Sequence, residues 1–213
     1  VIANHALMMV NAARGREEAS RPTRIIFDEG HHLFDAADST FAAALTGAEM
    51  VEIRRWVIGP EGKARGRRRG LSARLADVAS YDEAGGLAIE AARYAAEALP
   101  GDGWLGRVGE GMPSGPAERL LSAVRTTVYA RDEGQAESGY GLETEYANLD
   151  PHLIEAIAEM MKALEALAKP LTVLGQRLEA LVEEAPDWLD GAARARIEGA
   201  MASLGSVSYT HLR

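Results

Sequence analysis

The longest regular pattern in the chain is a run of apolar residues spaced alternately four and three positions apart. Such spacing places these residues on one face of an α-helix, as in the seam of a coiled coil. Because proline cannot donate a backbone hydrogen bond, we expect Pro170, which falls inside the run, to kink the helix or turn it back. The seam predicts a long helix whose apolar face lies in a helical core. Its residues are Leu153, Ile157, Met160, Leu164, Leu167, Leu171, Leu174, Leu178 and Leu181.

The region that carries this seam is acidic. Residues 143–190 contain eleven carboxylates against three basic side chains, a surplus of eight negative charges that should repel a phosphate backbone. We therefore interpret the long helix as a structural arm. Shorter apolar patterns predict further helices and a glycine- and proline-rich connector, from which Trp104 and Leu105 dock on the core. The expected helices cover residues 5–13, 33–57 with a break near 46–47, 71–78, 87–98, 117–128 and 190–204, and the connector covers 101–115.

Composition limits what the protein can be. With 213 residues, 47% of them hydrophobic, the chain can form one large or two small globular domains. A net charge of −9 excludes a generally basic coat for nucleic acid, so contact with DNA must be local. There are no cysteines, no run of about 20 apolar residues and no signal peptide, which together predict a protein of the reducing cytoplasm, away from membranes. We also expect the protein to be a monomer.

One short stretch carries chemistry. Ile25, Ile26 and Phe27 form an apolar run without polar alternation, which predicts a strand buried on both faces of a parallel sheet. Asp28 and Glu29 follow it, at the strand end where ligands bind in open α/β sheets. Paired acids there suit nucleotide hydrolysis: Asp28 would hold Mg²⁺, directly or through water, and Glu29 would activate the attacking water. The plain alternative is an acidic turn that caps a helix.

Two strings, in the right order and about twenty residues apart, carry a family resemblance. Asp28-Glu29-Gly30-His31, continued by His32 and Leu33, resembles the motif II (DEAH-type) box of the DinG/XPD-like helicases of superfamily 2. Val1-Ile2-Ala3-Asn4-His5-Ala6-Leu7 resembles the Asn-His-Ala-Leu stretch that these DNA helicases carry shortly upstream. Glycine at position 30 replaces the commoner alanine, a small change that should leave the turn intact.

The resemblance implies a mostly α-helical piece with a small α/β portion. Residues 1–51 would be part of the first RecA-like motor domain, with the motif II strand in its parallel sheet, and residues 52–205 a helical insertion like the family's arch domain. Residues 206–213 fit neither the helical spacing nor the family, and we interpret them as a non-native tail.

The implied activity is ATP-driven translocation on single-stranded DNA, usually 5′ to 3′ in this family. Catalysis would use Asp28, Glu29 and His31, with His31 relaying the nucleotide state toward the DNA. ATP and Mg²⁺ are the implied cofactors, and a 4Fe-4S cluster is often held by cysteines upstream of residue 1. This polypeptide lacks the phosphate-binding loop and the second motor domain, so we expect it to be inactive alone.

A basic stretch interrupts the acidic chain. Residues 52–74 hold eight basic side chains against two acids. Positive charge suits contact with the phosphates of single-stranded DNA, without base stacking because residues 59–70 contain no aromatic side chain, whereas a solvated loop is the plain alternative. The candidate contacts are Arg65, Arg67, Arg68 and Arg69.

Two other functions remain open at this point. A metal-dependent hydrolase could use Asp28, Glu29, His31, His32 and Asp35, although adjacent histidines are expected to point apart on a strand or a helix. The chain could also be a non-catalytic helical interaction module.

Overall fold

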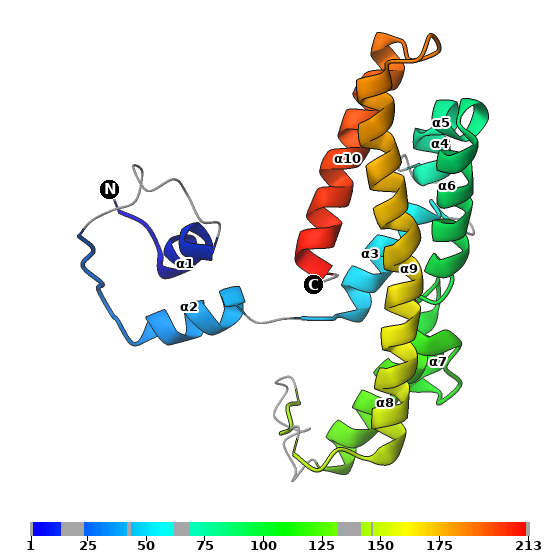
Figure 1. Cartoon of the computed structure of the whole chain (residues 1–213). Coiled ribbons are helices and arrows are strands. Elements are labelled where there is room, and N and C mark those ends of the chain that lie inside the picture. Colours follow the sequence, from blue (N-terminus) through cyan, green and yellow to red (C-terminus); the bar gives the residue numbers. More distant parts are fainter. Residues whose placement is uncertain are drawn as a thin grey trace. The chain divides into compact units, whose positions relative to one another are not determined.

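The computed structural model describes residues 2–13, 24–41, 44–61, 69–131, 142–145 and 147–211, with the side chains of 13 and 206–211 excepted. The chain forms two compact units, Val1–Ala44 and Leu45–Arg213 (Figure 1). The sequence predicts a domain boundary between residues 51 and 52. The structure assigns residues 45–51 to the second unit, because Met50 already lies in the core of that unit. In the parts described, no helix is both long enough and apolar enough to cross a membrane.

The N-terminal unit contains two helices, α1 (His5–Ala13) and α2 (His32–Phe41), which pack against each other. Asn4 caps α1 as its side-chain oxygen accepts a hydrogen bond from the Leu7 N–H at 2.8 Å, which satisfies one of the free donors of the first turn. Both helices lie where the sequence predicted them. No described side chain of this unit is buried, so the unit has no core of its own.

The predicted strand at residues 25–27 is not formed among the described residues. Residues 24–27 have no regular secondary structure, and Ile26 is 98% exposed. A strand needs a neighbouring strand for its backbone N–H and C=O groups. The described residues contain no strand that could pair with it, so the parallel-sheet portion of the expected fold is not observed.

The second unit is a helical bundle built around one long helix (Figure 1). α9 packs against α6, α8 and α10. The first two helices of the unit, α3 and α4, cover the remaining side of the core. The helices are α3 (Gly47–Val57), α4 (Leu71–Arg74), α5 (Ala76–Tyr81), α6 (Glu83–Ala96), α7 (Trp104–Gly109), α8 (Gly115–Ala130), α9 (Pro151–Glu184) and α10 (Gly191–His211).

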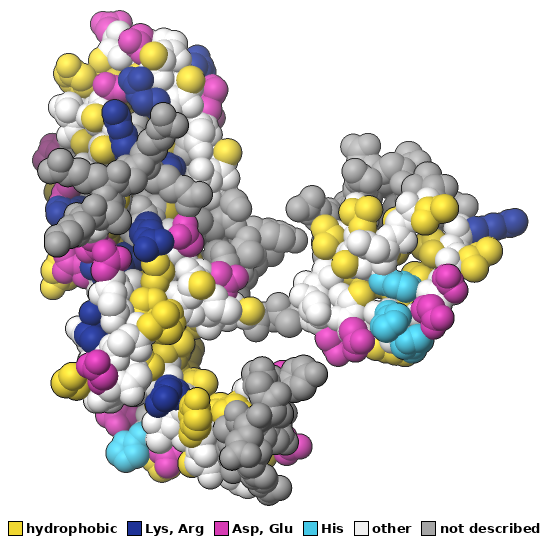
Figure 2. Space-filling view, turned by 180° about the vertical axis from the view of Figure 1, so that it is seen from behind, with side chains coloured by type: hydrophobic (Ala, Val, Ile, Leu, Met, Phe, Trp, Pro, Cys, Tyr) yellow, Lys and Arg dark blue, Asp and Glu magenta, His cyan; other side chains and the backbone are white. Residues whose placement is uncertain are grey.

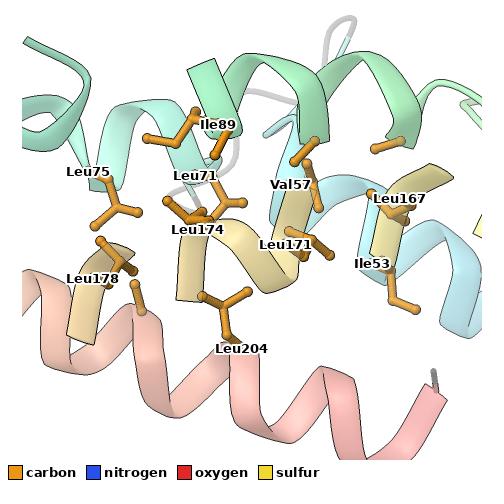
Figure 3. Close-up of a cluster of buried hydrophobic side chains, with 14 of the residues drawn as sticks. Ile53, Val57, Leu71, Leu75, Ile89, Leu167, Leu171, Leu174, Leu178 and Leu204 are labelled. Carbon is orange, nitrogen blue, oxygen red and sulfur yellow. The ribbon is translucent and has the colours of Figure 1, made fainter. Parts of the chain in front are cut away.

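The leucine seam of α9 is the centre of the core. Leu174 and Leu178 are fully buried, and they face Leu71 and Leu75 from the short helices (Figure 3). α9 runs through Pro170 without turning back. A proline inside a helix costs about 3 kcal/mol, and burial of seam leucines on both sides of Pro170 offsets this cost.

Three sequence predictions about the bundle were wrong. The helix at 87–98 is predicted from the apolar spacing of Leu87 and Tyr94, but these residues are 67% and 78% exposed, because the buried face of α6 is the one that carries Ile89 and Ala92. The connector at 101–115 contains a helix, α7, and Leu105 on it is exposed. Residues 206–211 continue α10 as helix, so the helical pattern does not end at the expected start of the tail.

The start of α3 explains the predicted break near residue 46. Thr46 and Glu49 form a capping box, in which each side chain accepts a hydrogen bond from the other's backbone N–H at 3.1 Å. The next residue, Gly47, must be glycine, because a Cβ there would lie 2.4 Å from the indole ring of Trp104. Trp104 therefore docks on this part of the bundle, as predicted.

Two arginine–carboxylate pairs join different helices of the bundle. Glu118, only 2% exposed, accepts from Arg107 Nε and from the Ser114 N–H, each at 2.8 Å. Arg177 on α9 donates to Asp82 at 2.7 Å. Asp82 also caps α6 by accepting from the Gly85 N–H at 2.7 Å. These charge-assisted hydrogen bonds fix α7 to α8 and α9 to the start of α6.

These pairs predict acid sensitivity. The hydrogen bond from Arg107 lowers the pKa of Glu118 from its ordinary 4.5, and that from Arg177 lowers the pKa of Asp82 from 3.8. Their contribution to stability should be complete above those ordinary values and lost as the pH falls through the lower folded-state values. We expect the free energy of unfolding, measured in urea, to fall on acidification below about pH 4.5. Glu118→Gln should flatten that fall, whereas Glu183→Gln, an exposed carboxylate on α9, should leave it unchanged.

Candidate functional site

The acidic turn at residues 28–30 lies directly before α2. Glu29 adopts a left-handed backbone conformation, with φ of 50°, which is uncommon for a residue other than glycine. Its carbonyl accepts from the His32 N–H at 3.0 Å, and the Gly30 carbonyl accepts from the Leu33 N–H at 3.1 Å. The backbone therefore passes from the acidic pair into the helix through a tight turn. Strained conformations of this kind are concentrated at functional sites.

The side chains of this turn gather on one surface. Glu29 Oε2 lies 3.3 Å from His31 Nδ1, and the rings of His31 and His32 have centroids 4.0 Å apart. Figure 2 shows histidine and carboxylate side chains side by side on this unit. The prediction that the adjacent imidazoles point apart was wrong, because the turn preceding α2 does not hold His31 at helical spacing from His32.

The first string that resembles a helicase motif contacts the residue that directly precedes the second. The ring of His5, at the start of α1, stacks on Phe27 with centroids 5.9 Å apart and an angle of 19° between the rings. Phe27 directly precedes Asp28. No local pattern in the sequence indicates this contact, since the two residues lie on either side of a long connection.

The donor set of the turn fits a magnesium–nucleotide complex. Mg²⁺ prefers oxygen ligands and is commonly held by one or two carboxylates together with substrate phosphates and water. Asp28 and Glu29 are both exposed, so a ligand can reach them. In the parts of the chain that are described, no three histidine or acidic side chains converge as a metal site made of protein ligands alone would require.

The basic stretch is described only in part. Arg65, Arg67 and Arg68 lie outside the described residues, and Arg69 is exposed. The flanks of the stretch meet, because a Cβ on Gly59 would lie 3.1 Å from Gly70 N. Arg54 fixes the first flank by donating to both carboxylate oxygens of Glu61, at 2.6 and 2.8 Å.

A groove of about 980 Å³ between α8 and the start of α9 was not predicted. Arg119 and Glu159 form an ion pair at 2.8 Å in its wall, and Arg131 donates to the Asn148 carbonyl at 2.7 Å. These polar residues come from separate segments with no shared motif. Only the packing of α8 against α9 brings them together.

Fold and site together define a helical protein with two units, an exposed acidic turn on a small helical pair and a bundle centred on one long helix. Comparison of the chain with known protein families, with characterised proteins and with solved structures found no match.

Proposed function

We propose that this chain is a piece of an ATP-dependent DNA helicase of the DinG/XPD-like kind, comprising the motif II end of the first motor domain and much of an arch-like helical insertion. The observation that carries the proposal is the presence of two helicase-like strings, at residues 1–7 and 28–33, with His5 of the first string stacked on Phe27, the residue directly before the second.

The exposed apolar surface of the N-terminal unit supports the same reading. Ile26, Phe34 and Phe41 are 98%, 74% and 60% exposed in a unit without buried side chains among its described residues. Apolar surface of this kind normally contacts another part of a protein. In the proposed helicase, the remaining strands of the RecA-like sheet would pair with residues 25–27 and cover it.

The roles of the acidic turn follow from its chemistry. Asp28 would hold Mg²⁺, which supplies charge neutralisation on the nucleotide phosphates when it is bound. Glu29 would orient the attacking water and accept its proton. His31, 3.3 Å from the Glu29 carboxylate, would sense that group and relay the nucleotide state toward the DNA.

The recovered full-length reading frame tests this proposal. A phosphate-loop motif should lie within a few hundred codons upstream, and the purified full-length protein should hydrolyse ATP faster when single-stranded DNA is added. This polypeptide alone should not hydrolyse ATP at a helicase-like rate, with or without single-stranded DNA. A start codon directly before Val1, or a full-length protein without DNA-stimulated ATPase activity, would refute the proposal.

The basic stretch gives a prediction for this chain itself. Changing Arg67, Arg68 and Arg69 to alanine should weaken binding of single-stranded DNA and reduce the dependence of log K on log salt by about 2, since each phosphate contact contributes roughly 0.7. Fluorescence anisotropy of labelled single-stranded DNA between 50 and 200 mM salt measures both the affinity and its salt dependence. The protein concentrations are those typical of phosphate-dominated binding. The matched control changes Arg125, Lys162 and Lys169, which are exposed elsewhere on the bundle. Equal affinity of the two triple variants would reduce the stretch to a solvated loop.

The metal-dependent hydrolase finds less support. His31 and His32 lie together with Glu29 beside them, but among the described residues no group of three such side chains is arranged to hold a metal ion. Tight, stoichiometric binding of Zn²⁺ or Mn²⁺ to the purified chain would favour the hydrolase over the helicase. A non-catalytic helical module describes the bundle by itself and leaves the acidic turn without a role.

A further inference from the structure

His32, the first residue of α2, makes two contacts with the acidic turn. Its backbone N–H donates to the Glu29 carbonyl at 3.0 Å. Its imidazole lies against that of His31, with ring centroids 4.0 Å apart and an angle of 42° between the rings. The proposed catalytic roles fall on Asp28, Glu29 and His31, and His32 therefore contacts two of these three residues.

The direction of helical side chains explains why the ring of His32 reaches His31. The Cα–Cβ bonds of an α-helix tilt toward its N-terminus, so a side chain at the first helical position leans over the turn before the helix. That turn consists of residues 28–31. The N–H groups of His32 and Leu33 close it by donating to carbonyls within it. The imidazole of His32 therefore lies on a turn whose backbone is already held in place.

The contact between Glu29 and His31 needs such support. Glu29 Oε2 and His31 Nδ1 are 3.3 Å apart, but the two side chains are 69% and 66% exposed. Attraction between side chains so exposed is weak, because water screens it and both side chains lose rotamer freedom. Among the described residues, the ring of His31 has one aromatic contact, and that contact is with His32. This contact restricts the rotamers of His31 and keeps its Nδ1 edge toward the carboxylate.

We propose that His32 is a positioning residue, whose ring holds the imidazole of His31 against the Glu29 carboxylate. For its effect on catalysis, this inference rests on the proposed function. Because Nδ1 of His31 faces Glu29, Nε2 at the other edge of that ring is left to contact a further group. His32 acts by packing, so an aromatic ring without nitrogen atoms can replace it. Loss of the ring would release His31 and leave the carboxylate of Glu29 without its neighbour.

Nuclear magnetic resonance of the 213-residue chain tests this placement without any activity. The ring current of His32 shifts the resonances of the His31 ring protons, because the two rings are close. At constant pH, His32→Ala should move these resonances toward those of a freely rotating histidine, whereas His32→Phe should retain most of the displacement. His32 is exposed, so its replacement removes no core contact. The matched control, His152→Ala, removes an exposed histidine of α9 and should leave the His31 resonances unaltered. Unmoved His31 resonances in the His32→Ala chain would overturn the inference.

Steady-state ATP hydrolysis by the full-length protein, with single-stranded DNA present, tests the effect on catalysis. His32→Ala should lower kcat roughly 10- to 100-fold, the usual cost of losing a group that orients a catalytic side chain. The KM for Mg-ATP should stay unchanged, because the metal is assigned to Asp28, and His32→Phe should restore most of the rate.

Three outcomes separate the possible failures. A His32→Phe protein as slow as the His32→Ala protein would overturn the inference, since the imidazole nitrogens and not ring packing would then be required. A raised KM with unchanged kcat in the His32→Ala protein would overturn it as well. A full-length protein without DNA-stimulated ATPase activity would refute the proposed function alone, because the resonances of this chain still decide whether His32 holds His31.

Discussion

Replacing Glu29 with glutamine in the full-length protein should lower the rate of ATP hydrolysis roughly 100- to 10,000-fold, the usual contribution of a positioned general base. Glutamine keeps the shape of the side chain but cannot accept a proton from the attacking water. Nucleotide binding should be retained, because Glu29 is assigned to the water and Asp28 to the metal. The measurement is steady-state ATPase activity with single-stranded DNA, together with the affinity for Mg-ATP.

Two variants make this prediction specific. Asp28→Asn should weaken the Mg²⁺ dependence of nucleotide binding as well as the rate. Asp38→Asn makes the same chemical change on an exposed position of α2, outside the acidic turn, and should leave both quantities unaltered. A Glu29→Gln protein that hydrolyses ATP at the unmodified rate would remove the assigned role, and with it the main chemical support for a motor protein.

Leu174→Ala should lower the free energy of unfolding of the helical unit by about 2–5 kcal/mol, the range for truncating a buried leucine. Leu174 is fully buried and faces Leu71 in the centre of the core (Figure 3). Truncation removes apolar contacts and leaves a cavity that helices on several sides cannot close. Urea unfolding followed by tryptophan fluorescence measures the change, because all three tryptophans, Trp56, Trp104 and Trp188, lie in this unit.

The adjacent residue provides the matched control. Val173 is 51% exposed, so Val173→Ala on the same turn of α9 should change the free energy of unfolding by no more than about 0.5 kcal/mol. Equal losses from the two variants would mean that the seam does not form the core. A loss confined to Leu174 would confirm the burial pattern of α9 in solution.

Much of the local structure could be predicted because its causes are local. The helix at residues 5–13, the break at Thr46 and the seam of α9 each depend on residues within a few positions of one another. The site was less predictable. The acidic pair was recognised from its type and order, but its turn conformation and the stacking of His5 on Phe27 depend on how α1 meets the segment before α2.

By itself the sequence determined most of the helices, because helical periodicity and capping are properties of neighbouring residues, but it missed α7 inside the predicted connector. Only the tertiary structure decided which face of each helix is buried. On α6, two apolar rows have similar spacing, and packing against α9 buries the row with Ile89 and leaves Leu87 and Tyr94 in solvent. It also decided that α9 continues through Pro170, since burial on both sides of the proline outweighs the loss of one backbone hydrogen bond. Burial is a property of the whole assembly of helices, and no short stretch of sequence contains it.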